Sequence, residues 1–152
     1  MDGQADIWAT AVALALLDVA QRERRPFTLL CFDDRIRYQA NVRPGGKLPE
    51  EALFVPCGGG TDVSLCVGAA LEVIRTATGA MSKSDIVLVT DGESDSTTAP
   101  VLRERAGRTG VSILGFGIGI PPAALEPWCD EVHAVRDVDR LDEDIAGLMV
   151  GR

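Results

Sequence analysis

Apolar residues follow helical spacing over residues 6–23 and then change to the short run of a buried strand. Trp8 and Val12 share one face of this helix, and neighbouring leucines extend that face until little of the helix is polar. A charged last turn and Pro26 end the helix, because proline cannot continue it. The mainly apolar run Phe27–Phe32 then predicts a strand buried on both faces.

Polar and apolar residues alternate over residues 36–40, where Ile36 and Tyr38 stand between arginines. This period predicts a half-exposed strand that folds back antiparallel on the preceding strand and forms a charged sheet edge. Residues 48–55 predict at most a short helix. A glycine run then leads into a second helix, which carries apolar residues at helical spacing over residues 63–74.

The rest of the chain continues the alternation of strands and helices. We expect strands at residues 86–90, 111–116 and 132–135, and helices at residues 101–108 and 141–149. This order predicts an α/β fold with a mostly parallel sheet and helices on both faces. A chain of 152 residues is long enough to bury a core of its own, so residues 1–152 are expected to form a single domain.

One strand is missing from this order, because the chain begins with a helix where a doubly wound fold has already placed its first strand. In the strand order 3-2-1-4-5-6 the first strand lies in the middle of the sheet. Without it, the strands at residues 27–32 and 86–90 are expected to face each other across a gap. We expect that something else fills this gap or that the natural chain begins earlier.

The composition restricts the classes of partner. A formal net charge of −8 argues against nucleic acid, whose binding needs a basic surface, and favours metal ions or basic partners. The four cysteines form no Cys-x-x-Cys pair and lie in or near apolar stretches, so they are expected to be reduced and buried. No secretion signal or bilayer-length apolar run is present, and the expected location is the cytoplasm, without membrane insertion.

Two loops carry oxygen donors of the kind that bind hard cations. Gly58-Gly59-Gly60-Thr61-Asp62 precedes the second helix, and Asp91-Gly92-Glu93-Ser94-Asp95 follows the strand at residues 86–90. Carboxylates and hydroxyls beside water suit Mg²⁺, so Thr61 and Asp91 are candidate ligands, with Asp62 and Glu93 as possible additions. Each loop also has an ordinary interpretation: Thr61 or Asp62 as a helix N-cap, and Asp91-Gly92 as a tight turn.

Taken together, the two loops resemble the second and third metal-site loops of the von Willebrand factor type A (VWA) domain. The likeness is to the bacterial CoxE-like group and covers nearly the whole chain. The segments that carry it are residues 11–17, Gly59-Gly60-Thr61-Asp62, residues 85–93 and residues 125–132. The resemblance implies a Rossmann-like VWA sheet and a metal-ion-dependent adhesion site (MIDAS). In that site Thr61 is the coordinating threonine, Asp91 is the aspartate of the third loop, and the ion is Mg²⁺ or Mn²⁺.

The chain departs from the family at the first metal-site loop. The family's Asp-x-Ser-x-Ser, which supplies an aspartate and two serines after the first strand, has no counterpart here. The family signature commonly continues Ser-Gly-Ser-Met, and we expect Met1 to be such an internal methionine, with the natural chain starting earlier. If the chain truly begins at Met1, metal binding through Thr61 and Asp91 is expected to be weak or absent.

The resemblance implies a binding module rather than an enzyme. The metal of such a domain leaves a coordination position for an acidic residue of a partner protein. Relatives in the CoxE-like group act as adaptors for MoxR-type AAA+ ATPases, which implies a similar partner here.

Two other functions stay open at the level of sequence. The first is a metal-dependent α/β hydrolase or phosphotransfer enzyme that uses the Asp91 loop, with the glycine run binding an anion at a helix N-terminus. No P-loop lysine or Gly-x-Ser-x-Gly elbow supports it, and His133, the only histidine, lies in an apolar stretch. The second is a structural interaction domain whose metal site is vestigial.

Overall fold

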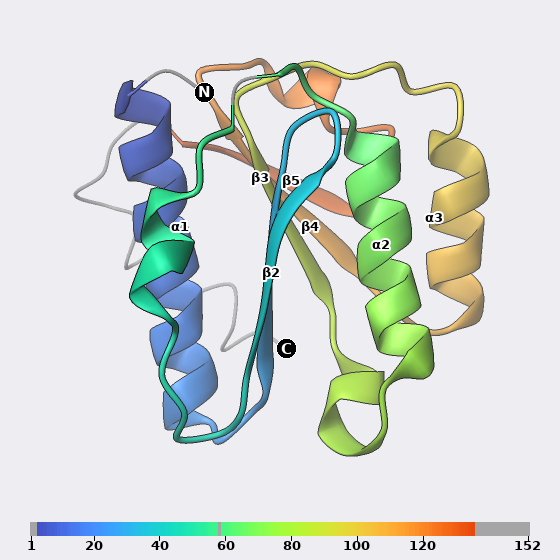
Figure 1. Cartoon of the computed structure of the whole chain (residues 1–152). Helices are drawn as coiled ribbons and strands as arrows, with labels where there is room; N and C mark the ends of the chain where they lie inside the picture. The colour runs from blue at the N-terminus through green and yellow to red at the C-terminus, as the bar shows by residue number, and fades with distance from the viewer. Residues whose placement is uncertain (1–2, 58, 136–152) are drawn as a thin grey trace.

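The computed structural model describes residues 3–57 and 59–135, which form two separate β-sheets with helices against them (Figure 1). The first sheet pairs β1 (Phe27–Phe32) with β2 (Ile36–Val42) in antiparallel fashion. The second sheet is parallel, in the order β3 (Ile86–Thr90), β4 (Ile113–Ile118) and β5 (Glu131–Val135). The hairpin and the parallel strands therefore agree with the predicted α/β class.

Helices lie on both faces of the strands. Helix α1 (Gly3–Arg22) is on one side in Figure 1, and α2 (Val63–Thr76) and α3 (Ala99–Arg108) are on the other. Short 3-10 helices occupy three connections, at Glu50–Phe54, Gly79–Lys83 and Pro122–Ala124. No helix of the described residues is long and apolar enough to cross a membrane.

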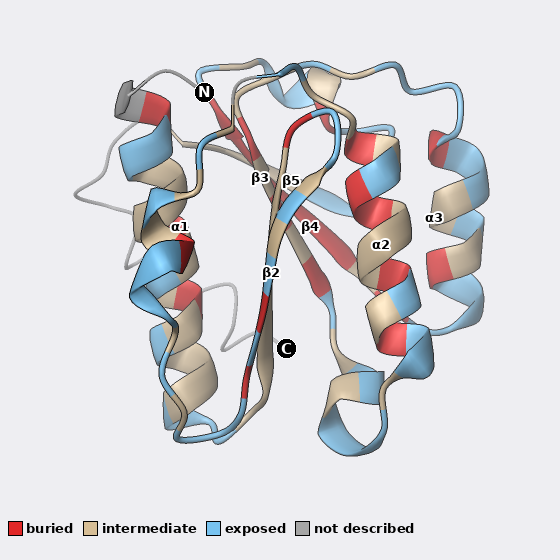
Figure 2. Cartoon of the chain, in the orientation of Figure 1, coloured by how far each residue is buried: buried red, intermediate tan, exposed pale blue. Residues whose placement is uncertain are grey.

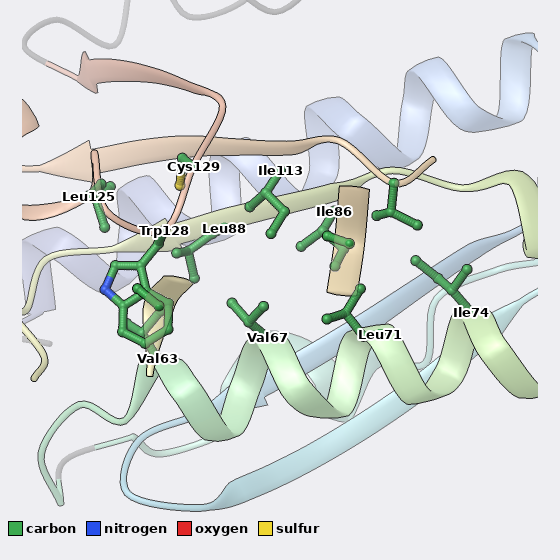
Figure 3. Close-up of a cluster of buried hydrophobic side chains, with 13 residues drawn as sticks. Val63, Val67, Leu71, Ile74, Ile86, Leu88, Ile113, Leu125, Trp128 and Cys129 are labelled. Carbon is green, nitrogen blue, oxygen red and sulfur yellow. The ribbon is translucent and has the colours of Figure 1, made fainter. Parts of the chain in front are cut away.

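Strand β4 shows how the two layers are built, because its successive side chains point to opposite faces. Ile113 belongs to the larger core, which α2, α3, β3 and the loop before β5 share, whereas Leu114 joins Val12 and Leu16 of α1 in the smaller core. Figure 2 shows the buried residues concentrated along β4 and on the inner face of α2. Figure 3 shows the larger core, where the buried side chains of α2 point at β3 and β4.

Several element bounds differ from those predicted. Strand β4 begins at Ile113 rather than at residue 111, because the Val111 amide donates to the Ala106 carbonyl at 2.9 Å and closes the end of α3. Helix α3 begins at Ala99 rather than at residue 101. A proline stands in its first turn, where a backbone N–H has no hydrogen-bond partner within the helix, so its absence costs nothing. The predicted helix over residues 141–149 lies outside the described residues.

The burial predicted for the first helix and the first strand is wrong. All six residues of β1 are only partly buried, whereas all six of β4 are buried. Trp8, predicted on the buried face of α1, is likewise only partly covered, and Leu14 is exposed. For β1 the physical reason is the gap between the sheets, which leaves one edge of the strand without a neighbouring strand, whereas Trp8 and Leu14 do not line this gap.

That gap is a pocket of about 740 Å³, which we call the interstrand slot. Every residue of β1 and every residue of β3 lines it, together with residues of helices α1 and α2 and of the segment 48–57. Figure 1 shows β1 and β3 running in the same direction on either side. The strand count predicts such a gap at this position.

Candidate functional site

The two oxygen-rich loops meet at one edge of the molecule, where β1 and β3 end and α2 begins (Figure 1). Thr61 stands two residues before α2, and Asp91 directly follows β3. Because β1 and β3 run in the same direction, the loops after both strands emerge at the same edge. Local sequence thus places each loop, and the shared direction of the strands brings the loops together.

The contact between the loops is made by the Thr61 side chain and the backbone of Gly92. A Cβ atom at Gly92 would lie 2.2 Å from Thr61 Oγ1 and 3.0 Å from Thr61 Cβ. Only a residue without a side chain leaves room for the threonine in this position. The Thr61 hydroxyl therefore lies directly beside the residue that follows Asp91.

Further hydrogen bonds hold the two loops in register. The Val63 amide, in the first turn of α2, donates to Ser94 Oγ at 3.2 Å. The Gly92 amide donates to Oγ1 of the buried Thr90 at 3.1 Å, which tightens the turn that carries Asp91. Both Thr61 and Asp91 are partly buried, so their oxygens lie at the rim of the molecule rather than in its core.

Asp33 also belongs to this edge, although the sequence predicts only a turn there. It is 2% exposed and follows β1 directly. Its carboxylate accepts from Arg37 Nε at 2.7 Å and from the Gly59 amide at 3.3 Å, and its carbonyl accepts from the Asp62 amide at 2.9 Å. Asp33 thus anchors the segment that carries Thr61. The sequence feature that could have indicated this role is a carboxylate directly after an apolar strand.

The other predicted donors are less centrally placed. Asp62 is the N-cap of α2, and its side chain accepts from the Leu65 amide at 3.0 Å, which agrees with the capping interpretation. Glu93 is exposed. Asp95 accepts from the Thr97 hydroxyl and from the Thr97 amide, and these hydrogen bonds hold the pKa of its carboxyl below the usual value. The Asp62 carboxylate is thus engaged in capping α2, and Glu93 points to solvent-exposed surface rather than into the contact between the loops.

The chemistry of the site suits a hard cation only in part. Within the described residues, no group of three or more histidine, cysteine, aspartate or glutamate side chains is arranged to hold a metal ion. The Thr61 hydroxyl lies against Gly92, the residue after Asp91. A hydroxyl and a carboxylate are nevertheless oxygen donors of the type that Mg²⁺ accepts together with several waters. The residues present fit a weakly held, hydrated ion.

The thiols and the histidine lie in other surroundings. Burial raises the pKa of Cys31 to about 11 and that of Cys66 to about 12, so both are neutral thiols at pH 7. His133 Nε2 lies 2.8 Å from Glu131 Oε1, and its ring packs against Phe116 in β4. Strand β4 separates this histidine from β3, so it is not placed as a general base for the Asp91 loop.

Comparison with known proteins identifies the fold. No family model matches the chain. One uncharacterized protein of Methanocaldococcus jannaschii is 31% identical over 98 residues, which cover 62% of this chain and 22% of that protein. A second one is 28% identical over 128 residues, which cover 80% of this chain and 31% of that protein. The chain thus spans less than a third of either relative.

Among solved structures, the chain is similar to a von Willebrand factor type A protein from Catenulispora acidiphila. The TM-score is 0.63 and the identity is 22%, over 91% of this chain and 37% of that one. A likeness at this identity establishes the fold alone. The molecule has the Rossmann-like fold of a VWA domain, as its sequence predicts.

Proposed function

We propose that this VWA-type domain is a protein-binding module whose contact with its partner depends on a divalent cation held by Thr61 and Asp91. The contact of the Thr61 side chain with Gly92 carries the proposal, because it brings the two donor loops together. When bound, Mg²⁺ or Mn²⁺ supplies a positive charge and an open coordination position for an acidic side chain of the partner.

The residues of the chain itself have separate tasks in this proposal. Thr61 and Asp91 hold the ion, Gly92 leaves room for the threonine, and Ser94 ties the Asp91 loop to α2. Asp33 fixes the backbone before Thr61. As partner we propose a MoxR-type AAA+ ATPase, on the likeness of these loops to those of the CoxE-like group.

We propose binding rather than catalysis, because no general base accompanies the donors in the described residues. His133, the only histidine of the chain, is engaged with Glu131 on the far side of β4. The hydrogen bonds that hold the Asp91 loop join backbone amides to hydroxyl groups, and neither kind of group is a general base.

The experiment is a titration of the protein with Mn²⁺, followed by electron paramagnetic resonance of the free ion, because this readout needs no partner. We expect Thr61→Ala and Asp91→Ala each to weaken binding at least about tenfold, which corresponds to about 1.4 kcal/mol. Matched controls are Thr98→Ala and Asp18→Ala, whose side chains are exposed in other parts of the fold. Binding that is equal in all four variants, or absent in the parent, would refute the proposal.

A further inference from the structure

One end of this acidic protein carries a cluster of positive charges. The cluster, which we call the basic end, lies where α1 stops and in the loop after β2, and consists of Arg22, Arg24, Arg25, Arg43 and Lys47. The segments 18–25 and 43–47 that carry it hold two carboxylates, although the whole chain has a net charge of −8. The basic end lies opposite the edge that carries Thr61 and Asp91 (Figure 1).

The side chain of Gln21 ties the two segments together. The Gly45 amide donates to Gln21 Oε1 at 2.7 Å, and Gln21 Nε2 donates to the Gly46 carbonyl at 2.9 Å. Both segments also adjoin the open end of the hairpin, where Phe27 pairs with Val42. The cations of the helix end and those of the loop therefore belong to one surface rather than to two separate turns.

Arg24 has a backbone conformation that favours glycine. At the end of α1, the Arg25 amide donates to the Ala20 carbonyl at 2.8 Å and the Arg24 amide donates to the Gln21 carbonyl at 3.2 Å. This is the Schellman pattern, in which the left-handed residue is usually glycine. Arg24 takes that position with φ 54°, and no other residue except glycine has a positive φ within residues 3–57 and 59–135. A cation therefore stands where a residue without a side chain would be less strained.

The dipole of α1 and local ion pairs account for only part of the basic end. Cations in the last turn of a helix interact favourably with its dipole, and Arg22 and Arg25 each pair with a carboxylate of the same segment. Arg24, Arg43 and Lys47 are exposed and form no ion pair with any described residue. Their charges are therefore free to meet the charges of another molecule.

The surroundings of the basic end favour a short anionic segment over a long polyanion. Charges interact over about 10 Å at an ionic strength of 0.1 M. Nucleic acid or an anionic bilayer would extend beyond the two short segments and meet the negative charge of the rest of the protein. A short run of carboxylates would meet mainly the cations, and the guanidinium groups of arginine bind carboxylates with two parallel hydrogen bonds.

We propose that the basic end binds a short run of aspartate and glutamate residues in a partner polypeptide, through Arg24, Arg43 and Lys47. This is a second contact surface, which needs no metal ion and lies at the end of the molecule opposite the site of the proposed function. The net charge alone favours basic partners, whereas the distribution of the charges adds an acidic one.

The test measures binding of the rhodamine-labelled peptide acetyl-Gly-Asp-Glu-Asp-Glu-Gly-amide by fluorescence anisotropy at low ionic strength. Divalent metal is first removed with a chelating resin, so that Thr61 and Asp91 do not contribute and the failure of one proposal leaves the other intact. Each exposed ion pair is worth about 1.4-fold to fivefold in affinity, so Arg24→Gly combined with Arg43→Gln should weaken binding at least about threefold.

The matched control combines Arg35→Gln with Arg108→Gln, which removes the same net charge from exposed positions outside the basic end. Binding by this variant should match that of the parent. Arg24→Gly should leave the urea midpoint unchanged or raise it, because glycine suits the left-handed conformation, so loss of folding does not explain weaker binding. Amide chemical shifts in NMR spectra locate the peptide, and those of residues 22–25 and 43–47 should move most.

Several results would overturn the proposal. Equal binding of a peptide with asparagine and glutamine in place of the acidic residues would show that charge plays no part. Equal weakening in the control variant, or shifts confined to other residues, would place the peptide elsewhere. Tighter binding of an oligonucleotide or of anionic vesicles would assign the basic end to another class of partner. Self-association that the Arg24→Gly and Arg43→Gln variant loses would make a second copy of the chain the occupant.

Discussion

At the scale of single residues, Gly92 decides whether the two loops can meet. Alanine at this position would bring Cβ to 2.2 Å from Thr61 Oγ1, so the threonine side chain would have to turn away or the loop would have to shift. We expect Gly92→Ala to cost about 1–3 kcal/mol of stability, as overpacking usually does, and to weaken Mn²⁺ binding as strongly as Thr61→Ala.

The control for Gly92→Ala is Gly68→Ala. Gly68 lies in α2, and a Cβ there would meet nothing within 4 Å. Alanine should be neutral or stabilise the helix by up to about 1 kcal/mol, with Mn²⁺ binding unchanged. Urea unfolding and the Mn²⁺ titration measure both effects. Unaltered metal binding in Gly92→Ala would mean that the position of the Thr61 hydroxyl does not matter.

Asp33 lies in a turn, but its substitution is expected to change the free energy of unfolding more than that of an ordinary turn residue. Asparagine keeps the shape of the side chain but removes the charge that pairs with Arg37, and it leaves the buried hydrogen bonds incompletely satisfied. We expect Asp33→Asn to lower the free energy of unfolding by about 1–3 kcal/mol. The neighbouring Asp34→Asn, at an exposed ion pair, should change it by less than about 1 kcal/mol. Equal losses in the two variants would argue against the anchoring role.

At the scale of elements, an ion pair joins helices α2 and α3. Glu72 Oε2 lies 2.8 Å from Arg105 Nη2, and Arg75 also binds the same carboxylate. These hydrogen bonds lower the pKa of Glu72 from its ordinary value of 4.5 to about 2. The carboxylate therefore contributes stability fully above pH 4.5, and this contribution is lost as the pH falls from 4.5 towards 2.

Glu72→Gln tests this dependence. The difference in unfolding free energy between parent and variant should be present at pH 7 and should shrink as the pH falls below 4.5. Arg105→Gln should reproduce part of the change, whereas Arg22→Gln, at an exposed pair within α1, should not. Guanidinium chloride would screen the pairs, so the curves should be measured in urea. A pH-independent difference would contradict the assignment.

At the scale of the whole molecule, Trp128 joins the loop before β5 to the N-terminal end of α2. Its side chain is fully buried beside Val63 (Figure 3), although its Nε1 finds no hydrogen-bond partner among the described residues. We expect Trp128→Ala to cost about 3–5 kcal/mol, the usual loss for a buried tryptophan. Trp8→Ala should cost less than half as much, because Trp8 is only partly buried. Urea midpoints of the two variants provide the comparison, and similar losses would contradict the burial of the two side chains.

The interstrand slot also concerns the molecule as a whole, and it explains why β1 is less buried than β4. Among residues 3–57 and 59–135, no strand pairs with both β1 and β3. Occupation of the slot would cover the exposed edges of both sheets and join them into one.

The local pattern of the sequence was sufficient for most elements of this protein. Helices α1 and α2, the hairpin of β1 and β2, and the buried strand β3 lie where periodicity and turn residues place them, because each depends on neighbouring residues. The gap between β1 and β3 was also predictable, since it follows from the order of elements. The start of β4 could not be predicted from the local pattern, because a hydrogen bond from the Val111 amide to the end of α3 decides it.

For the candidate site, the sequence alone determined the types of donor and the loops that carry them. It also indicated that strand direction would bring Thr61 and Asp91 to one edge. Only the tertiary structure decided that Thr61 packs on Gly92, that Asp62 serves as a helix cap and that Asp33 anchors the loop. It also decided how far β1 is covered. The physical reason is that burial and contacts between loops depend on residues that are distant in the chain, and their positions are known only once the sheets and helices have packed.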